Sequence, residues 1–466
     1  MTMDPCFLSL TEQAGLLSNF GMTSVELTAA HLNRIARLDS SLHAFITIDG
    51  DGALMAASDS DARRQMGRVK GVLDGLTIGV KDLIDVAGLP TTAAAVHRRH
   101  HQALHNAAVV DAMKNAGAVI LGKTTTAEYA VGGTALDGIY PAARNPWDRD
   151  RDASSSSSGS AVAVVAGLAA GALGTETAGS IRVPAAWCGA AGLVPTQALV
   201  SRRGVLPISR SMDCIGPLAR SAEDCAVMLQ AMITFDAGDR ATPDFHLPDP
   251  KRIFANICGL RIGIPRHVFE DDPDLAPEVR EAFTTTLYCL RDLGFSLVDV
   301  TLAGYDDWAD AARKISWPEE YAEHEEELRN YPERFGSVTR SRLREGLKFS
   351  APDYVLALRQ REKARASLRS TFGEVDLLAL PTAKTPAQPF GYEHEPDARD
   401  FTYARPFNLP GVPMLALCNG FSEAGLPLSV QFIAKPFDDD LLLGVGMSVE
   451  RTIRSELTRN PNCVSR

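Results

Sequence analysis

The feature of this sequence that most constrains its fold is a repeated order of helix, glycine and short apolar strand. A helical pattern over residues 107–116 runs into Gly117 and the strand-like segment Ala-Val-Ile-Leu. The same order recurs from a helix near 276–293 through Gly294 to Phe-Ser-Leu-Val-Asp-Val. Helices that alternate with short apolar strands are typical of layered α/β proteins. We therefore expect an α/β fold.

Five other segments have patterns that predict local structure. Residues 71–90 are β-branched and punctuated by glycine, which predicts a strand, a turn and a second strand. The 14-residue stretch from Ala161 to Gly174 is rich in Ala and Gly, is too short to span a bilayer, and predicts a buried helix. Residues 235–250 and 381–391 predict loops. The highly charged segment 318–349 predicts helices in a solvated outer layer.

The composition excludes several classes of protein. Of the 466 residues, 45% are hydrophobic and 23% are charged, which is ordinary for a globular protein and argues against disorder. The formal net charge of −11 argues against nucleic-acid or anionic-membrane binding, because no basic run accompanies it. The 8 cysteines form no Cys-x-x-Cys pair, and the first residues lack a secretory signal pattern. We expect a soluble, reduced, cytoplasmic protein.

Two motifs suggest ligands that their context does not support. The segment from Gly117 to Thr124 matches the phosphate-binding pattern G-x-x-x-x-G-K-T. A true phosphate loop follows a strand and precedes a helix, whereas here a helix comes first and the variable positions are strand residues, so we predict a structural Lys123. The histidines of H-R-R-H-H-Q-A-L-H lack a carboxylate at ligand spacing, and we predict an exposed basic turn and no metal site.

Lys81 stands in an apolar run of strand length, Leu-Thr-Ile-Gly-Val-Lys-Asp-Leu-Ile. On an edge strand such a lysine reaches solvent, and this alternative stays open from the sequence. A buried lysine instead has to lose its proton or find a partner, because desolvation disfavours the ammonium. Moving its pKa from about 10.4 towards neutrality takes a shift of about 3 units, which burial can supply. A neutral amine beside a hydroxyl is a general base.

The serine tract from Ser154 to Ser158 leads through Gly159 and Ser160 into an Ala-rich segment. Serine-rich tracts are often flexible loops. A Ser-Gly-Ser step into a buried helix instead predicts a tight turn whose hydroxyls bind free amide groups. Further on, Ser180 follows small residues whose consecutive amides can point at one oxygen and stabilise a tetrahedral oxyanion.

At this point the sequence resembles the amidase signature family over nearly the whole chain. The matching motifs include the strand motif G-L-T-I-G-V-K-D-L-I-D-V-A-G-L-P-T-T, A-G-A-V-I-L-G-K-T-T-T-A-E-Y-A, N-P-W-D, the serine–glycine block, F-N-L-P-G-V-P and G-L-P-L-S-V-Q-F-I-A. Several ordered motifs in one chain are far more specific than any single pattern. The resemblance implies a single domain, residues 1–466, with a mixed β-sheet core sandwiched between layers of α-helices.

The resemblance also divides that domain and assigns its chemistry. We expect an N-terminal helical segment at about 5–65, a signature core at about 70–235 and a C-terminal portion at about 255–455. The implied triad is Ser-cisSer-Lys, with Lys81 as base, Ser156 as bridging serine and Ser180 as nucleophile. Neither a metal nor an organic cofactor is implied. The implied oxyanion donors are the backbone amides of Thr177, Ala178, Gly179 and Ser180.

The chain departs from the family pattern at several glycines. Ser154, Ser155 and Ser158 stand where the family usually has glycine, and Ala178 replaces a common glycine of the oxyanion turn. If such a position needs a positive φ, the substitution is strained by about 1–2 kcal/mol. Two further departures lie outside the glycines: Glu176 for a common Asp, and Val194 for a common Lys.

We expect an amide hydrolase that transfers the acyl group of a small or medium carboxamide to water, with a homodimer as its candidate assembly. By resemblance, Ser155 and the loop with Val131 and Gly132 line the substrate pocket. Two alternatives remain: the A subunit of a tRNA-dependent amidotransferase with glutaminase activity, and a catalytically silent scaffold of the same fold.

Overall fold

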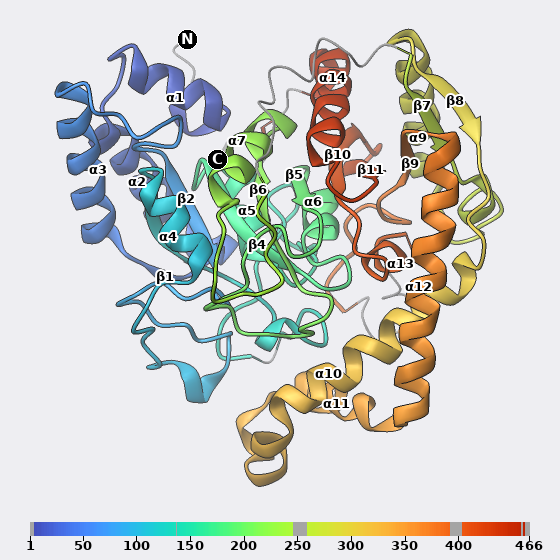
Figure 1. Ribbon diagram of the computed structural model, residues 1–466. Helices are drawn as coiled ribbons and strands as arrows, with labels where there is room; N and C mark the ends of the chain where they lie inside the picture. Colours follow the sequence, from blue (N-terminus) through green and yellow to red (C-terminus); the bar gives the residue numbers. More distant parts are fainter. Residues whose placement is uncertain (1–3, 137, 246–258, 392–402, 458–459, 462–466) are drawn as a thin grey trace.

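The described part of the chain builds its core on one mixed sheet of 11 strands. The computed structural model describes residues 4–136, 138–245, 259–391, 403–457 and 460–461 (Figure 1). The strand order is β1-β3-β2-β4-β6-β5-β10-β11-β9-β7-β8. The strands are β1 (Phe45–Ile48), β2 (Thr77–Lys81), β3 (Val119–Thr124), β4 (Gly171–Glu176), β5 (Ala191–Val194), β6 (Cys214–Ala219), β7 (Arg261–Ile264), β8 (Ser296–Asp299), β9 (Leu377–Pro381), β10 (Met414–Phe421) and β11 (Pro427–Ala434).

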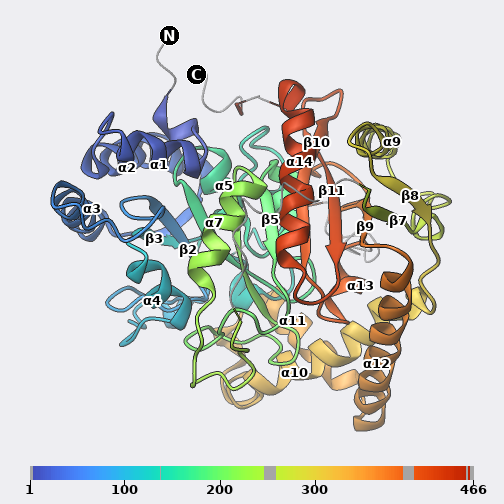
Figure 2. The same ribbon diagram turned by 45° about the horizontal axis from the view of Figure 1, so that its top comes forward.

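Helices cover this sheet and extend beyond it. In Figure 2, α7 and α14 lie side by side in front of β5, β10 and β11, and both pack on the sheet. α5 and α6 contact each other and also pack on the sheet. The helices are α1 (Leu10–Ser18), α2 (Ser24–Leu42), α3 (Gly50–Gln65), α4 (Ala108–Asn115), α5 (Ser158–Val165), α6 (Arg182–Cys188), α7 (Ala222–Met232), α9 (Pro277–Asp292), α10 (Trp308–Asn330), α11 (Ser337–Arg344), α12 (Ala351–Glu374), α13 (Arg405–Asn408) and α14 (Asp439–Leu457).

The sheet mixes parallel and antiparallel pairs, and the change of direction occurs beside the candidate site. β2 runs parallel to both of its neighbours, β3 and β4. β4 then pairs antiparallel with β6. The carboxyl ends of β2 and β4 therefore lie at the same edge of the sheet, next to the start of β6. Side chains from three separate segments of the chain meet there.

The predicted helix–glycine–strand order is confirmed at both places. α4 leads through Gly117 into β3, and α9 leads through Gly294 into β8, with both glycines in the left-handed region at φ 89° and φ 85°. The segment that matches the phosphate-binding pattern is thus a turn followed by β3. Lys123 lies within β3, a strand position and not the start of a helix.

Two local predictions were wrong. The stretch from Ala161 to Gly174 is not one helix: α5 ends at Val165, and β4 begins at Gly171. Gly167, at φ 68°, lies between the two elements. Periodicity alone cannot distinguish a buried helix from a buried strand in such a run of small apolar residues. In residues 71–90 only β2 forms a strand, and the second predicted strand is replaced by two isolated bridges, Ile84 with Val205 and Pro90 with Gln102.

The segment 318–349 is helical, as predicted, but it is not a wholly solvated layer. α10, α11 and α12 extend beyond the sheet at the lower right of Figure 1. Glu320 and Arg342 form an ion pair of 3.0 Å in which the glutamate side chain is only 8% exposed. Leu328 and Phe335 pack with Tyr129, so this helical unit is anchored to the signature core.

Three sequence expectations concern residues spread through the chain. No helix in the described ranges combines the length and the apolar composition that crossing a membrane requires. The cysteines within those ranges are free thiols, and Cys188 is buried. Within the same ranges, no cluster of histidine, cysteine and carboxylate side chains has the arrangement of a metal site.

The small residues at the start of α5 allow a very close approach between segments. A Cβ atom built on Gly159 would overlap with the amide nitrogen of Thr125 and the carbonyl oxygen of Ala44. Both of these atoms belong to the backbone, so they cannot move aside cheaply. Gly159 is therefore required by packing, and it holds the serine turn against the loop that follows β3.

This contact predicts a large effect of one methyl group. Gly159→Ala is expected to lower the free energy of unfolding by about 1–3 kcal/mol, the usual cost of overpacking. The matched control is Gly15→Ala in α1, where a Cβ meets nothing within 4 Å and a gain of about 0.5–1 kcal/mol is expected. Urea unfolding of the wild type and of both variants measures these changes in the free energy of unfolding. A wild-type midpoint for Gly159→Ala would contradict it.

Candidate active site

The amine of Lys81 lies at the centre of the candidate site. Lys81 is the last residue of β2, and its side chain is fully buried. Its Nζ lies 2.7 Å from Ser156 Oγ, 3.0 Å from Ser157 Oγ and 2.8 Å from Thr175 Oγ1. A fourth contact, of 3.3 Å, is with the carbonyl oxygen of Thr175. All of these partners are uncharged.

The position of β2 within the sheet explains this burial. Because β2 lies between β3 and β4, every one of its residues is buried and Lys81 cannot reach solvent as it would from an edge strand. Burial holds the pKa of Lys81 well below its ordinary value, although the charges of Asp213 and Glu176 oppose this. Of the two alternatives that the sequence left open, the structure therefore adopts the buried lysine and not the lysine that reaches solvent from an edge strand.

Lys123 on the neighbouring strand is equally buried but has different partners. Its Nζ forms an ion pair of 2.9 Å with Asp82 Oδ1, and it also donates to Thr91 Oγ1 at 3.0 Å. Burial lowers the pKa of Lys123, and Asp82 opposes that shift. Lys123 thus neutralises a buried carboxylate, which is a structural role, while Lys81 has hydroxyl partners.

The serine tract forms a tight turn before α5. The peptide bond between Ser155 and Ser156 is cis. Ser154 has φ 65°, in the left-handed region, so serine in place of the family's glycine is strained there by about 1–2 kcal/mol. Ser158 is the first residue of α5. The other residues that replace common glycines, Ala178, Ser155 and Ser158, do not have a positive φ. Strain from a left-handed backbone conformation therefore applies only to Ser154 among these four residues.

A buried ion pair holds the loop between β4 and α6. Glu176 ends β4, and its Oε2 accepts hydrogen bonds from the amides of Ile181 at 2.9 Å and Arg182 at 3.0 Å, which places a carboxylate at the amino end of α6. Arg182 donates back to Glu176 Oε1 at 2.7 Å and to Gln431 Oε1 of β11 at 2.6 Å. The loop 177–180 is therefore fixed at both ends.

Ser180 lies at the end of this loop and is half-buried. Its carbonyl oxygen accepts a hydrogen bond from the amide of Ser157 at 3.1 Å, so the loop adjoins the serine turn. Among the described residues, neither the hydroxyl of Ser180 nor the amides of Ala178, Gly179 and Ser180 have a hydrogen-bond partner. The structure thus joins Ser156 directly to Lys81, and joins Ser180 to the turn through the backbone.

Two residues expected to line the substrate pocket pack against the outer helices. Val131 is buried in an apolar cluster with Tyr129 and Phe335. A Cβ on Gly132, which has φ 81°, would come within 2.9 Å of Val338 in α11. Ser155 is half-buried within the serine turn. The role of Val131, Gly132 and Ser155 in binding substrate stays a prediction.

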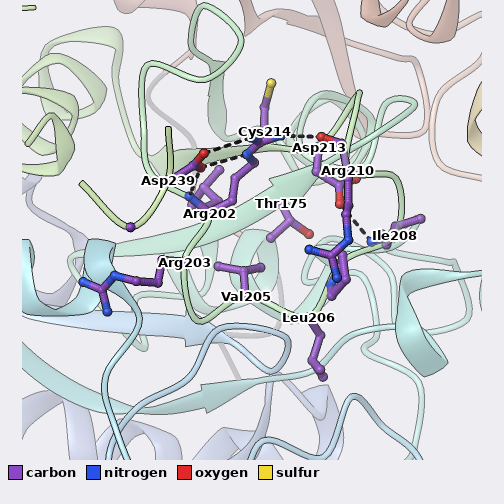
Figure 3. Close-up of a pocket in the computed structure, with 13 residues that line it drawn as sticks. Thr175, Arg202, Arg203, Val205, Leu206, Ile208, Arg210, Asp213, Cys214 and Asp239 are labelled. Carbon is purple, nitrogen blue, oxygen red and sulfur yellow. Dashed lines mark hydrogen bonds and ion pairs between the residues drawn. The ribbon is translucent and has the colours of Figure 1, made fainter. Parts of the chain in front are cut away.

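A cavity of about 220 Å³ adjoins the site on the side of Thr175. Figure 3 shows Thr175 with Asp213, Arg202 and Asp239 around it. Arg202 is paired with Asp239 at 3.1 Å. Thr175 lines the cavity and also contacts Lys81, so one side chain links the buried amine to this space.

Sequence reasoning missed three residues of this arrangement. Ser157 and Thr175 both contact Lys81, and Asp213 lies at the cavity. The position of Ser157 next to Ser156 was a weak signal, but only the turn geometry directs its hydroxyl to the same amine. No local pattern singles out Thr175 or Asp213, because their contacts are with distant segments.

Comparison with known proteins identifies the family. A sequence profile of the family described as Amidase matches residues 26–443. The chain belongs to the amidase family. Its sequence is 38% identical to the A subunit of the glutamyl-tRNA(Gln) amidotransferase from Chloroflexus aurantiacus, across 95% of this chain and 96% of that relative. The resemblance to the amidase signature family inferred from the motifs is thereby confirmed.

Solved structures of the amidase family share the fold. One, described as the crystal structure of amidase, is 32% identical with a TM-score of 0.85, and the match covers 96% of this chain and all of that one (100%). Another, from work on a vestigial protein complex and the evolutionary origins of an s-triazine catabolic enzyme, is 31% identical with a TM-score of 0.90, covering 96% and 98%. The predicted single-domain α/β fold with a mixed sheet between helices is confirmed.

The different partners of the two buried lysines predict different costs of removal. Lys123→Met leaves Asp82 buried without its cation and is expected to lower the free energy of unfolding by about 3–5 kcal/mol. Lys81→Met leaves only hydroxyl and carbonyl groups, some of which bond one another, and about 1–2 kcal/mol is expected. Chemical denaturation measures both. Equal losses would contradict the assigned roles.

Proposed function

We propose that this amidase cleaves the C–N bond of a carboxamide through an acyl-enzyme on Ser180. Lys81 is the general base and Ser156 relays the proton. The observation that carries this proposal is the buried amine of Lys81, whose hydrogen-bond partners are uncharged and which lies 2.7 Å from Ser156 Oγ. Burial and a pKa far below the ordinary lysine value favour the neutral amine, which can accept a proton.

The acylation step moves one proton along two hydroxyls. Lys81 takes the proton of Ser156, Ser156 takes the proton of Ser180, and Ser180 Oγ forms a bond to the amide carbon. The carbonyl oxygen gains the negative charge, and the amides of Ala178, Gly179 and Ser180, which have no hydrogen-bond partner among the described residues, supply donors for it. The C–N bond then breaks as the proton returns from Lys81 through Ser156 to the departing nitrogen.

Deacylation repeats the same relay with water. A water molecule loses a proton through Ser156 to Lys81 and attacks the acyl carbon. The bond between that carbon and Ser180 Oγ then breaks as the proton returns from Lys81 through Ser156 to Ser180, and the carboxylic acid is released. No metal or organic cofactor takes part in this scheme. The substrate we propose is a small or medium carboxamide, and the nitrogen product is ammonia or an amine.

The comparisons favour a second candidate more than free-standing hydrolysis. The relative from Chloroflexus aurantiacus, 38% identical over almost the whole of both chains, is the A subunit of a glutamyl-tRNA(Gln) amidotransferase, as is a 34% identical relative from Myxococcus xanthus. In this second candidate the carboxamide is that of glutamine, and the ammonia passes to a partner protein. The chemistry at Ser180 is the same in both.

The proposed nucleophile is tested by covalent labelling. A fluorophosphonate or sulfonyl fluoride probe is expected to label Ser180, and Ser180→Ala is expected to lose the label and to lower kcat by at least about 10³-fold. Ser158→Ala, in the same tract but without contact to Lys81, is the matched control and keeps the label. Labelling that survives Ser180→Ala would place the nucleophile at another residue and contradict the assignment, and a wild-type protein that is never labelled would favour the silent scaffold.

Ammonia release separates the two candidate substrates. Wild-type protein is incubated with glutamine and with a panel of other primary carboxamides, and free ammonia is measured. Turnover of the panel by the chain alone supports a free-standing hydrolase. Release from glutamine, increased when the other amidotransferase subunits are added and found in a stable complex with them, supports the amidotransferase role.

A further inference from the structure

Asp213 occupies the junction between the loop 177–180 and the cavity beside Lys81. It directly precedes β6, and the pairing of Glu176 with Cys214 brings it next to Thr177. Its carboxylate lines the cavity together with Thr175 (Figure 3). Neither the reaction scheme above nor any sequence motif uses this residue.

The carboxylate of Asp213 joins two loops through hydrogen bonds. Its Oδ1 accepts from Thr177 Oγ1 at 2.5 Å. Its Oδ2 accepts from the amides of Ile208 at 2.8 Å and Ser209 at 3.0 Å. The first residue of the loop 177–180 is therefore tied, through Asp213, to the segment that forms the cavity wall.

The segment that contains Ile208 and Ser209 is also held by α10. Glu319 accepts hydrogen bonds from Ser209 Oγ at 2.6 Å and Ser211 Oγ at 2.7 Å. Tyr354 of α12 donates to the same carboxylate at 2.7 Å. Asp213 thus bonds the same segment that Glu319 of α10 holds, and Thr177 is tied to this segment through Asp213.

Asp213 also contributes negative charge near the buried amine. Its charge is the largest of those that raise the pKa of Lys81, ahead of Glu176. Burial raises the pKa of Asp213 itself to about 6, against the hydrogen bonds from Thr177, Ile208 and Ser209 and the charge of Arg202. The titratable and charged groups around Asp213 are Lys81, Glu176, Arg202, Arg203, Arg210, Cys214, Asp239 and Glu319.

We propose that Asp213 is a positioning residue of the active site. It holds Thr177, and with it the loop 177–180, in place, and it sets the electrostatic environment of Lys81 from the cavity side. This inference rests on the proposed function, since it assigns Asp213 a part in the reaction of Ser180. Asp213 therefore has two effects, one on the position of the loop 177–180 and one on the charge near Lys81. Two different substitutions measure these effects separately.

Thr177→Val isolates the geometric effect. It removes the hydroxyl that Asp213 accepts from, but it leaves the carboxylate and its charge in place. We expect kcat for a primary carboxamide that the wild type hydrolyses to fall by about 10–100-fold, because oxyanion donors lose alignment. The acid limb of the pH–kcat profile is expected to stay where it is in the wild type. Wild-type kcat in Thr177→Val would overturn the positioning role.

Asp213→Asn isolates the charge. The asparagine oxygen can still accept from the amides of Ile208 and Ser209, and its amide group can donate to Thr177. With the negative charge gone, the protonated form of Lys81 loses stabilisation, so its pKa falls. The acid limb of kcat is then expected to move to lower pH by about 1 unit. An unshifted limb would overturn the electrostatic role.

Asp239→Asn is the matched control, because Asp239 lines the same cavity but bonds Arg202 and not Thr177. It is expected to leave both kcat and the acid limb unchanged. If Asp213→Asn does not fold, Asp213→Glu takes its place, and wild-type kcat in that variant would overturn the inference. A wild type without any activity on carboxamides would instead contradict the proposed function, so the two failures are distinguishable.

Discussion

The burial of a lysine amine among uncharged groups is the constraint on which the rest of this site depends. Lys81 meets Ser156 and Ser157 from the serine turn and Thr175 from β4, with no carboxylate within ion-pair distance among the described residues. An unpaired ammonium in such a place would cost several kcal/mol, so the amine is most stable when neutral. The chain has to bring three segments around one nitrogen atom, and the order β3-β2-β4 with α5 packed on it achieves this.

Two buried ion pairs form the frame around that amine. Asp82 and Lys123 lock the residue after Lys81 to the neighbouring strand, and Glu176 and Arg182 lock the loop that carries Ser180 to α6 and, through Gln431, to β11. Such pairs are weak sources of net stability, but removing one partner is costly, so they specify one arrangement. Charge is therefore paired in the two carboxylate–cation contacts of this frame, whereas the amine of Lys81 has only uncharged partners among the described residues.

The sequence departs from its family at positions where the structure shows different consequences. Ser154 adopts a left-handed conformation that glycine would adopt freely, so the serine turn carries some strain. Ala178 has no such conformation, and the neighbouring Gly179, at φ 113°, provides the freedom that the loop requires. Glu176 takes the place of a shorter carboxylate and still reaches the amides of α6. The chain thus forms both the serine turn and the loop 177–180, and it shares its overall fold with its solved relatives.

The sequence by itself determined the fold class, from the order α4–Gly117–β3, and the family and candidate residues Lys81, Ser156 and Ser180, from ordered motifs, because these signals are local in the chain. The tertiary structure decided the rest. Only packing showed that Ala161–Gly174 splits into α5 and β4, because a run of small apolar residues carries no periodicity that separates helix from strand. Only the order of the strands decided that Lys81 is buried among hydroxyl groups, whereas Lys123 forms an ion pair with Asp82. Asp213 acquired its place beside Thr177 through the pairing of β4 with β6, which joins residues far apart in sequence and leaves no local trace.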